Sequence, residues 1–330
     1  MPGAQERVLR RRIGSVQNTK KITRAMELIA ATRVAKAQLR ANEARPYAEH
    51  ITNVIQDLAA GGAEADHPLL RPVEKPTKVG IVVMAADRGL AGGYNSSVIK
   101  AAEREVQAAR SEGKAYALVT IGNKAAAYFR FRNYDIEAEF AGFSDKPTFS
   151  DAAEIAARVS ELFITGGCDQ ILLAYTRFIS LGSQEPVVRR FLPLESAAVV
   201  ATEGDAQATA GFEFEPSGSA VLESLLPRYV EARIFAALLD SAASEHASRQ
   251  RAMKAATDNA EDLIVSLTRK INQVRQEAIT TEIMEIIGGA EALADDRGDP
   301  EDLILDNMFS DPFPNRDGEH VRHVIGHDSF

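Results

Sequence analysis

Apolar residues in the first part of the chain repeat at intervals of three and four, as they do in a helix with one narrow apolar seam. The repeat extends over residues 6–58 and is interrupted by a single proline, Pro46, which would either kink the helix or mark a break. At about 1.5 Å per residue, a continuous helix of this kind would be roughly 80 Å long. The expected seam consists of Leu9, Ile13, Val16, Ile22, Met26, Ile29, Tyr47, Ile51, Val54 and Leu58.

A different pattern occupies the middle of the chain. Continuous apolar runs at residues 79–84, 115–121 and 171–175 predict strands buried on both faces, and helical stretches near 97–110 and 150–164 separate them. Ser150, followed by acidic residues, is the expected N-cap of the second of these helices. The alternation predicts a small α/β domain of the Rossmann-like kind over residues 77–200, reached through a glycine- and proline-rich connector at 61–76.

A second seamed helix is expected over residues 219–293, roughly 110 Å long if unbroken. Its apolar character is lost through residues 244–250 and then resumes. The expected seam consists of Leu225, Tyr229, Ala232, Ala236, Leu239, Ala243, Ile264, Leu267, Ile271, Val274 and Ala278, with a shift of one residue to Ile279, Ile283 and Ile286. Two such helices bury their seams most simply against each other, so the sequence predicts an α/β fold with a long antiparallel coiled coil.

These patterns divide the chain into an N-terminal coiled-coil helix (1–60), the connector (61–76), the α/β domain (77–200), a C-terminal coiled-coil helix with its lead-in (211–293) and an acidic tail expected to be disordered (294–330). Three histidines in the tail, His320, His323 and His327, lack cysteine partners and favour solvated side chains over a metal site.

Charge is distributed unevenly along the chain. Residues 1–45 carry eleven Lys and Arg against three Glu, a net charge of +8, whereas residues 291–330 carry three Arg against eleven acidic residues, a net charge of −8. A basic helix is typical of a solvated face or of a surface that binds an acidic partner. A nucleic-acid-binding coiled coil is an alternative, but interleaved aromatic residues and a reading module are missing from the sequence.

The single cysteine, Cys168, excludes an internal disulfide, and the start of the chain does not resemble a signal peptide. No apolar run is long enough to span a bilayer. Cys168 has no histidine nearby, and no metal-ligand spacing is present, so neither a catalytic residue, a metal nor a cofactor is expected.

The sharpest local motif is the glycine-rich turn at residues 86–95, between a predicted strand and a predicted helix. Its glycines, Gly89, Gly92 and Gly93, fit neither the dinucleotide fingerprint nor the P-loop. A tight structural turn is therefore favoured, and a nucleotide-dependent α/β enzyme with helical arms is the alternative.

Several segments resemble the gamma subunits of F-type ATP synthases. They are residues 11–26 (RRIGSVQNTKKITRAM), 29–32, 45–48, 87–95 (DRGLAGGYN), 244–249 (SEHASR), 255–260, 275–282 (RQEAITTE) and 285–290 (EIIGGA). The resemblance covers about residues 5–293 and departs in two places: Ala91, where the family often has cysteine, and the longer tail.

The resemblance implies a noncatalytic central stalk that couples proton flow through the membrane rotor ring to conformational change in the catalytic beta subunits. Its expected partners are the alpha, beta and epsilon subunits and the ring, at the cytoplasmic face of the cell membrane, with no nucleic acid and no cofactor. The Arg24–Met26 stretch is expected to pass the beta subunits, and Thr23 beside it is expected to face outward, within reach of a cross-link to them. Residues expected to face the beta subunits or to couple the helices are Met26, Arg249, Arg275, Gln276, Thr280 and Glu282, and those expected to touch the rotor ring are Phe212, Phe214 and Glu215.

Overall fold

The computed structural model describes residues 2–60, 67–71, 73, 75–194 and 217–295. Phe212, Phe214, Glu215, the tail beyond residue 295 and its three histidines lie outside the described residues. The chain forms two compact units, Ser15–Ile264 and a second that combines Met1–Gly14 with Val265–Phe330.

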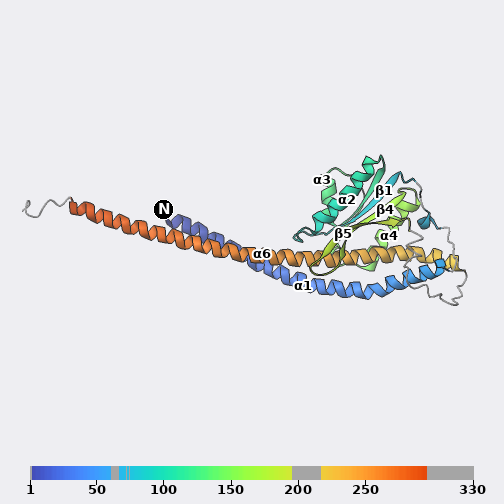
Figure 1. The fold of residues 1–330 in the computed structure, drawn as a ribbon, viewed down its shortest axis with the longest axis horizontal. Helices are drawn as coiled ribbons and strands as arrows, with labels where there is room; N and C mark the ends of the chain where they lie inside the picture. The colour runs from blue at the N-terminus through green and yellow to red at the C-terminus, as the bar shows by residue number, and fades with distance from the viewer. Residues whose placement is uncertain (1, 61–66, 72, 74, 195–216, 296–330) are drawn as a thin grey trace, which may run out of the picture. The chain divides into compact units, whose positions relative to one another are not determined.

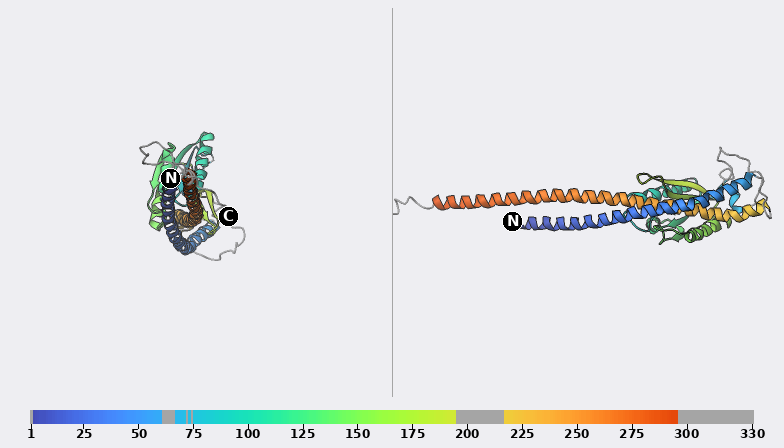
Figure 2. Two further views of the ribbon diagram at one scale, coloured as in Figure 1. Left: turned by 90° about the vertical axis from the view of Figure 1, so that its left-hand side faces the viewer. Right: turned by 90° about the horizontal axis from the view of Figure 1, so that it is seen from below.

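Two long helices, α1 (Pro2–Ala60) and α6 (Gly218–Asp295), each contribute to both units. The expected helices are confirmed, and both continue through an internal proline, Pro46 in α1 and Pro227 in α6. In the larger unit the two helices lie side by side (Figures 1 and 2). They are antiparallel there, because Lys20 contacts Glu261 and the later Thr23 contacts the earlier Thr257.

Between these helices the chain forms a five-stranded sheet with the strand order β3-β2-β1-β4-β5, in which only β5 is antiparallel to its neighbour. This arrangement confirms the predicted α/β domain. Its elements are the 3-10 helix η1 (Pro68–Leu70), β1 (Lys78–Met84), α2 (Tyr94–Ser111), β2 (Ala115–Ile121), α3 (Asn123–Phe131), β3 (Ile136–Phe140), α4 (Phe149–Ile164), β4 (Gln170–Phe178) and β5 (Gln184–Leu192).

Four elements, η1, α3, β3 and β5, were not predicted from the sequence. The two strands lie at the edges of the sheet and are only partly buried, so polar residues interrupt the apolar runs that identify a central strand. Pro186 within β5 is compatible with an edge strand, where one side makes no ladder hydrogen bonds. The predicted N-cap of α4 was wrong: Thr148 caps the helix in a reciprocal capping box with Asp151.

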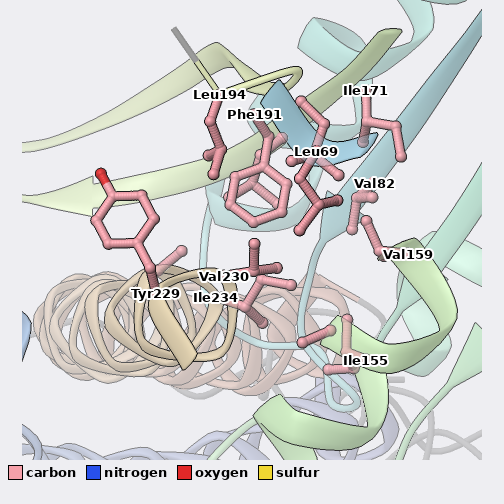
Figure 3. Close-up of a cluster of buried hydrophobic side chains, with 14 of the residues drawn as sticks. Leu69, Val82, Ile155, Val159, Ile171, Phe191, Leu194, Tyr229, Val230 and Ile234 are labelled. Atoms are coloured by element: carbon pink, nitrogen blue, oxygen red, sulfur yellow. The ribbon is translucent and has the colours of Figure 1, made fainter. Parts of the chain in front are cut away.

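Each face of the sheet packs against its own helices. Alternate residues of β1, Val79, Ile81 and Val83, belong to a core with α2 and α3, whereas Val82 and Met84 belong to a second core with α4 and both long helices. Figure 3 shows this second core, where Val82 and Ile171 of the sheet face Ile155 and Val159 of α4 and Ile234 of α6. The α/β domain is therefore built directly onto the long helices.

The predicted seam of α1 is rotated relative to the observed one in Ser15–Ile264. Ile22 is 62% exposed, Ile29 54%, Tyr47 50% and Val54 40%, and in α6 Ala236 is also exposed. Small or polar side chains, from Thr23 to Ala37, occupy much of the contact in the first half of α1, and a search for large apolar residues passes over them. Nearer the end of α1 the predicted seam residues Ile51 and Leu58 are confirmed as buried. The buried residues of α1 are Thr23, Glu27, Ala30, Val34, Ala37, Ile51, Ile55 and Leu58.

Gly122, after β2, provides a test of how closely the loops pack at the end of the sheet. Its φ is +91°, and a Cβ there would overlap the carbonyl oxygen of Ala85. Gly122→Ala should cost about 1–2 kcal/mol for the backbone conformation and about 2 kcal/mol more for the overlap. Gly113→Ala is the control, because its φ is +74° in open space. Urea denaturation should show the larger loss for Gly122→Ala, and equal losses would contradict the close approach.

Candidate functional site

The middle of α6 carries a polar segment that is deeply buried. The sequence predicted that the apolar seam is lost through residues 244–250, yet Ser244, Glu245 and His246 are at most 1% exposed and Arg249 is 8% exposed. The loss of apolar residues in this segment is thus not accompanied by exposure to solvent. Buried polar groups require partners, and the α/β domain and α1 supply them.

Arg249 joins α6 to the glycine-rich turn after β1. One guanidinium nitrogen, Nη2, donates to Glu245 Oε1 at 2.7 Å and to the carbonyl oxygen of Gly89 at 3.2 Å. The other, Nη1, lies 3.5 Å from His246 Nδ1. Arg249 thus holds the turn against the helix.

His246 joins the same part of α6 to the loop that precedes α4. Its Nε2 lies 3.0 Å from the carbonyl oxygen of Asp145, so this nitrogen carries the proton. Burial lowers the pKa of His246, and the Arg249 charge lowers it further, although the Asp145 carbonyl opposes this. A neutral imidazole follows, with Nδ1 free to accept from Arg249.

The loop also binds α1. Arg33 Nη1 of α1 donates to Asp145 Oδ2 at 2.7 Å, so Asp145 contacts α6 through its backbone and α1 through its side chain. We call Arg33, Gly89, Asp145, Glu245, His246 and Arg249 the polar junction, because these six residues connect both long helices to the α/β domain.

Burial sets the electrostatics of the polar junction. It raises the pKa of Glu245, while the charge and hydrogen bond of Arg249 oppose the rise. Burial also raises the pKa of Tyr94, and the Glu245 carboxylate adds to that shift. Oε2 of Glu245 has no hydrogen-bond partner among the described residues, so this carboxylate depends chiefly on Arg249 for compensation.

The glycine-rich turn is stabilised by its own residues. Asp87 accepts from the backbone N–H groups of Asn123, Gly142 and Ser144 at 2.9–3.0 Å. Burial alone would raise the pKa of Asp87, but these donors lower it below its usual value. Asn95 Oδ1 accepts from Ala86 N at 2.8 Å. These internal bonds support the structural interpretation of the turn over the nucleotide-binding one.

Elsewhere in the larger unit, the two helices contact each other directly through polar side chains. Thr23 and Thr257 are buried, and their hydroxyl oxygens lie 2.8 Å apart. Lys20 Nζ lies 3.1 Å from Glu261 Oε1 nearby. Thr23 therefore faces α6, and the expectation that it faces outward was wrong; the neighbouring Ile22 is the exposed residue.

The residues singled out from the sequence are not gathered in one place. Met26 is half-buried in the larger unit, and Arg249 belongs to the polar junction. Arg275, Gln276, Thr280 and Glu282 are exposed on the part of α6 that belongs to the other unit. Arg33, Asp145, Glu245 and His246 were not singled out as site residues. Glu245 and His246 lie in the polar run of α6 and in the segment 244–249 that resembles the family, whereas the sequence carries no comparable signal for Arg33 in α1 or Asp145 in the loop before α4.

Two negative findings apply to the described ranges. No helix there is both long enough and apolar enough to cross a membrane. In the same part of the chain, no cluster of three or more His, Cys, Asp or Glu side chains could hold a metal ion.

Removing one partner of the buried ion pair should be costly. In Arg249→Met, Glu245 would remain buried without compensation, and we expect a loss of about 3–5 kcal/mol in the free energy of unfolding. The raised pKa of Glu245 would rise further. The deficit relative to the unmodified chain should therefore shrink as the pH falls from 8 towards 5, because a protonated Glu245 needs no counterion.

Arg228→Met provides the control for Arg249→Met, since Arg228 pairs with Glu231 on the exposed surface of α6. It should cost less than about 1 kcal/mol at any pH. Urea denaturation of both variants at several pH values measures the difference. A similar, pH-independent loss in both would show that the Glu245–Arg249 pair has no special role.

Comparisons with known proteins agree on one family. Residues 5–293 match the family described as ATP synthase. The chain is 51% identical over 298 residues to the ATP synthase gamma chain of Parafrankia sp. (strain EAN1pec), covering 88% of this chain and 98% of that one. It is 50% identical over 299 residues to the ATP synthase gamma chain of Streptomyces griseus, covering 89% and 97%.

A solved structure shows the same fold. A chain in the cryo-EM structure of the Euglena gracilis mitochondrial ATP synthase superposes with a TM-score of 0.62 at 17% identity, covering 90% of this chain and 97% of that one. The family match and the curated relatives lead to one conclusion: the chain belongs to the family of ATP synthase gamma chains.

Proposed function

We propose that this chain is a noncatalytic rotary shaft that couples proton flow through the membrane rotor ring to conformational change in the catalytic beta subunits. The polar junction is the observation that supports this mechanism. Torque that enters through the α/β domain must reach the long helices without slippage, and directional contacts to Gly89 and Asp145 resist sliding better than apolar packing does.

Such a shaft would transmit the free energy that protons release as they cross the membrane. One charge crossing 100 mV supplies about 2.3 kcal/mol, so several protons must be pooled for each ATP released. Between these steps the shaft must hold strain rather than dissipate it. Two long helices tied to one domain at several points satisfy that requirement.

The shaft must also present different faces to equivalent sites. A pair of helices lacks threefold symmetry, so each of three beta subunits would meet a different surface and be stabilised in a different conformation. Ile22 and Ile29 are exposed on α1, at 62% and 54%. They lie on the same helix as the exposed Lys21 and Arg24. An exposed face that is both apolar and basic suits contact with alpha and beta subunits.

The remaining assignments follow from the family. The epsilon subunit and the rotor ring are the other proposed partners, and the complex would be held at the cytoplasmic face of the cell membrane through the ring. The body would consist of residues 77–200, and the shaft of residues 1–60 and 211–293. Residues 61–76 would connect the shaft to the body, and residues 294–330 would form a tail. Phe212, Phe214 and Glu215 remain proposed ring contacts, and Met26, Arg275, Gln276, Thr280 and Glu282 proposed contacts of the shaft.

A cross-link should test rotation directly. Ile22→Cys places a thiol on the exposed face of α1, and a second cysteine on the facing beta-subunit loop should form a disulfide with it in the assembled complex. Multisite ATP turnover should then stop, and reduction should restore it. Native Cys168 can remain, because it is 2% exposed and burial raises the pKa of its thiol to about 11.

Thr23→Cys is the matched control for Ile22→Cys. It lies one residue further along α1 but faces Thr257 and is 9% exposed, so it should form little disulfide with the beta subunit. If the fully cross-linked Ile22→Cys complex kept its turnover rate, the chain would not rotate against the beta subunits.

The exposed C-terminal part of α6 should affect coupling rather than folding. Arg275→Ala and Gln276→Ala remove exposed side chains, so each should change the free energy of unfolding by less than about 0.5 kcal/mol. If these side chains touch the beta subunits as proposed, ATP turnover of the assembled complex should fall roughly fivefold or more. Exposed Lys270→Ala is the control on the same helix. Turnover equal to that of the Lys270→Ala complex would remove both residues from the proposed contact.

A further inference from the structure

A cavity of about 790 Å³, partly open to solvent, lies in the larger unit and is lined by α1, Phe149 of α4, strands β4 and β5, and α6. Its volume falls within the range of small-molecule sites, roughly 300–1,000 Å³. We call it the arginine cavity. None of the residues of the polar junction lines it, so it is a separate feature of the fold.

Positive charge predominates around the arginine cavity. Five arginines and two carboxylates contribute to its lining. They are Arg45 and Glu49 from α1, Arg177 from β4, Arg189 and Arg190 from β5, and Arg233 and Asp240 from α6. Guanidinium groups bind phosphate through two parallel hydrogen bonds, so such a lining fits a phosphorylated ligand.

One of these arginines has an unused donor. Arg177 Nη2 donates to Glu185 Oε2 at 2.9 Å, but the buried Nε has no hydrogen-bond partner among the described residues. A buried N–H of a charged group is costly to leave unpaired. The Arg177 side chain as a whole is 41% exposed, so a phosphate would approach the guanidinium through its accessible atoms and compensate its charge.

Asp240 is the carboxylate placed among the arginines. Burial raises its pKa to about 6, although Arg45, Arg177 and Arg189 all favour the ionised form. The charge of Asp240 therefore competes with any anion for these three arginines at neutral pH, and protonation near pH 6 removes that competition.

Aromatic rings form another part of the lining. Phe149 lies edge-to-face with Tyr47 at 6.3 Å and with Phe235 at 5.6 Å between ring centroids, and all three residues line the cavity. Aromatic surface of this kind stacks with planar groups such as nucleobases. An inorganic anion would leave it unused.

We propose that the arginine cavity binds a nucleoside polyphosphate, with its phosphates at Arg45, Arg177 and Arg189 and its base against Tyr47, Phe149 and Phe235. This site is additional to the central-stalk role and does not depend on it. It is also distinct from the glycine-rich turn, which was the only nucleotide-site candidate that the sequence offered.

Isothermal titration calorimetry of the full chain with ATP at pH 7.5 tests the proposal. Arg189→Ala should weaken ATP binding about tenfold. Arg228→Ala removes the same charge from a residue outside the cavity and should leave binding unchanged. Arg45→Gln serves as a second cavity variant, expected to weaken ATP binding, and circular dichroism should confirm that each variant is folded.

Asp240→Asn provides a change in the opposite direction. Removing the competing charge should tighten ATP binding about tenfold at pH 7.5. The ratio of the two affinities should approach one at pH 5, because Asp240 is then protonated in the unmodified chain. Since the same ligand is used for both proteins, the titration of ATP itself cancels from this ratio.

Inorganic pyrophosphate is the second ligand, and it should bind more weakly than ATP because it has no base. Equal affinities would overturn the assignment to a nucleoside polyphosphate. Absence of binding at millimolar ATP, or an equal loss in Arg189→Ala and Arg228→Ala, would overturn the proposed site altogether.

Discussion

The buried pair of Glu245 and Arg249 is the interaction on which the arrangement of the larger unit depends. It lies in the middle of α6, where an ordinary coiled coil would place apolar residues, and Arg249 also binds the backbone of the turn after β1. Replacing such a pair by apolar residues is often neutral for stability. In this unit the hydrogen bonds of the pair fix the position of the α/β domain along α6. An apolar contact would hold the domain to the helix without fixing that position.

The same region shows how one loop can organise three elements. Asp87 orders the loop at residues 142–144 through backbone N–H groups, and the adjacent Asp145 then binds Arg33 of α1 and His246 of α6. The glycine-rich turn and this loop therefore act together. A motif that resembles a phosphate site in the sequence serves in the structure to position the domain against the helices.

Periodicity was enough to predict the long helices and the central strands, because their apolar patterns are long and regular. It could not predict β3 and β5, whose exposed faces interrupt the pattern, nor the rotation of the α1 seam towards Thr23 and Ala30. Counting large apolar residues selected Ile22 and Ile29, which are exposed. The polar junction and the arginine cavity could not be predicted from the sequence for a different reason. Each combines segments that are far apart in the sequence and that only folding brings together.

The hydroxyl contact between Thr23 and Thr257 has a consequence for the axial register of the two helices. An apolar seam tolerates a shift of one helical turn, about 5.4 Å, since one aliphatic residue can replace another in the contact. Here the same shift would separate the two hydroxyl groups and also Lys20 from Glu261. These contacts favour a single axial register of the two helices. A force along the helices would therefore deform the whole unit before one helix slid past the other.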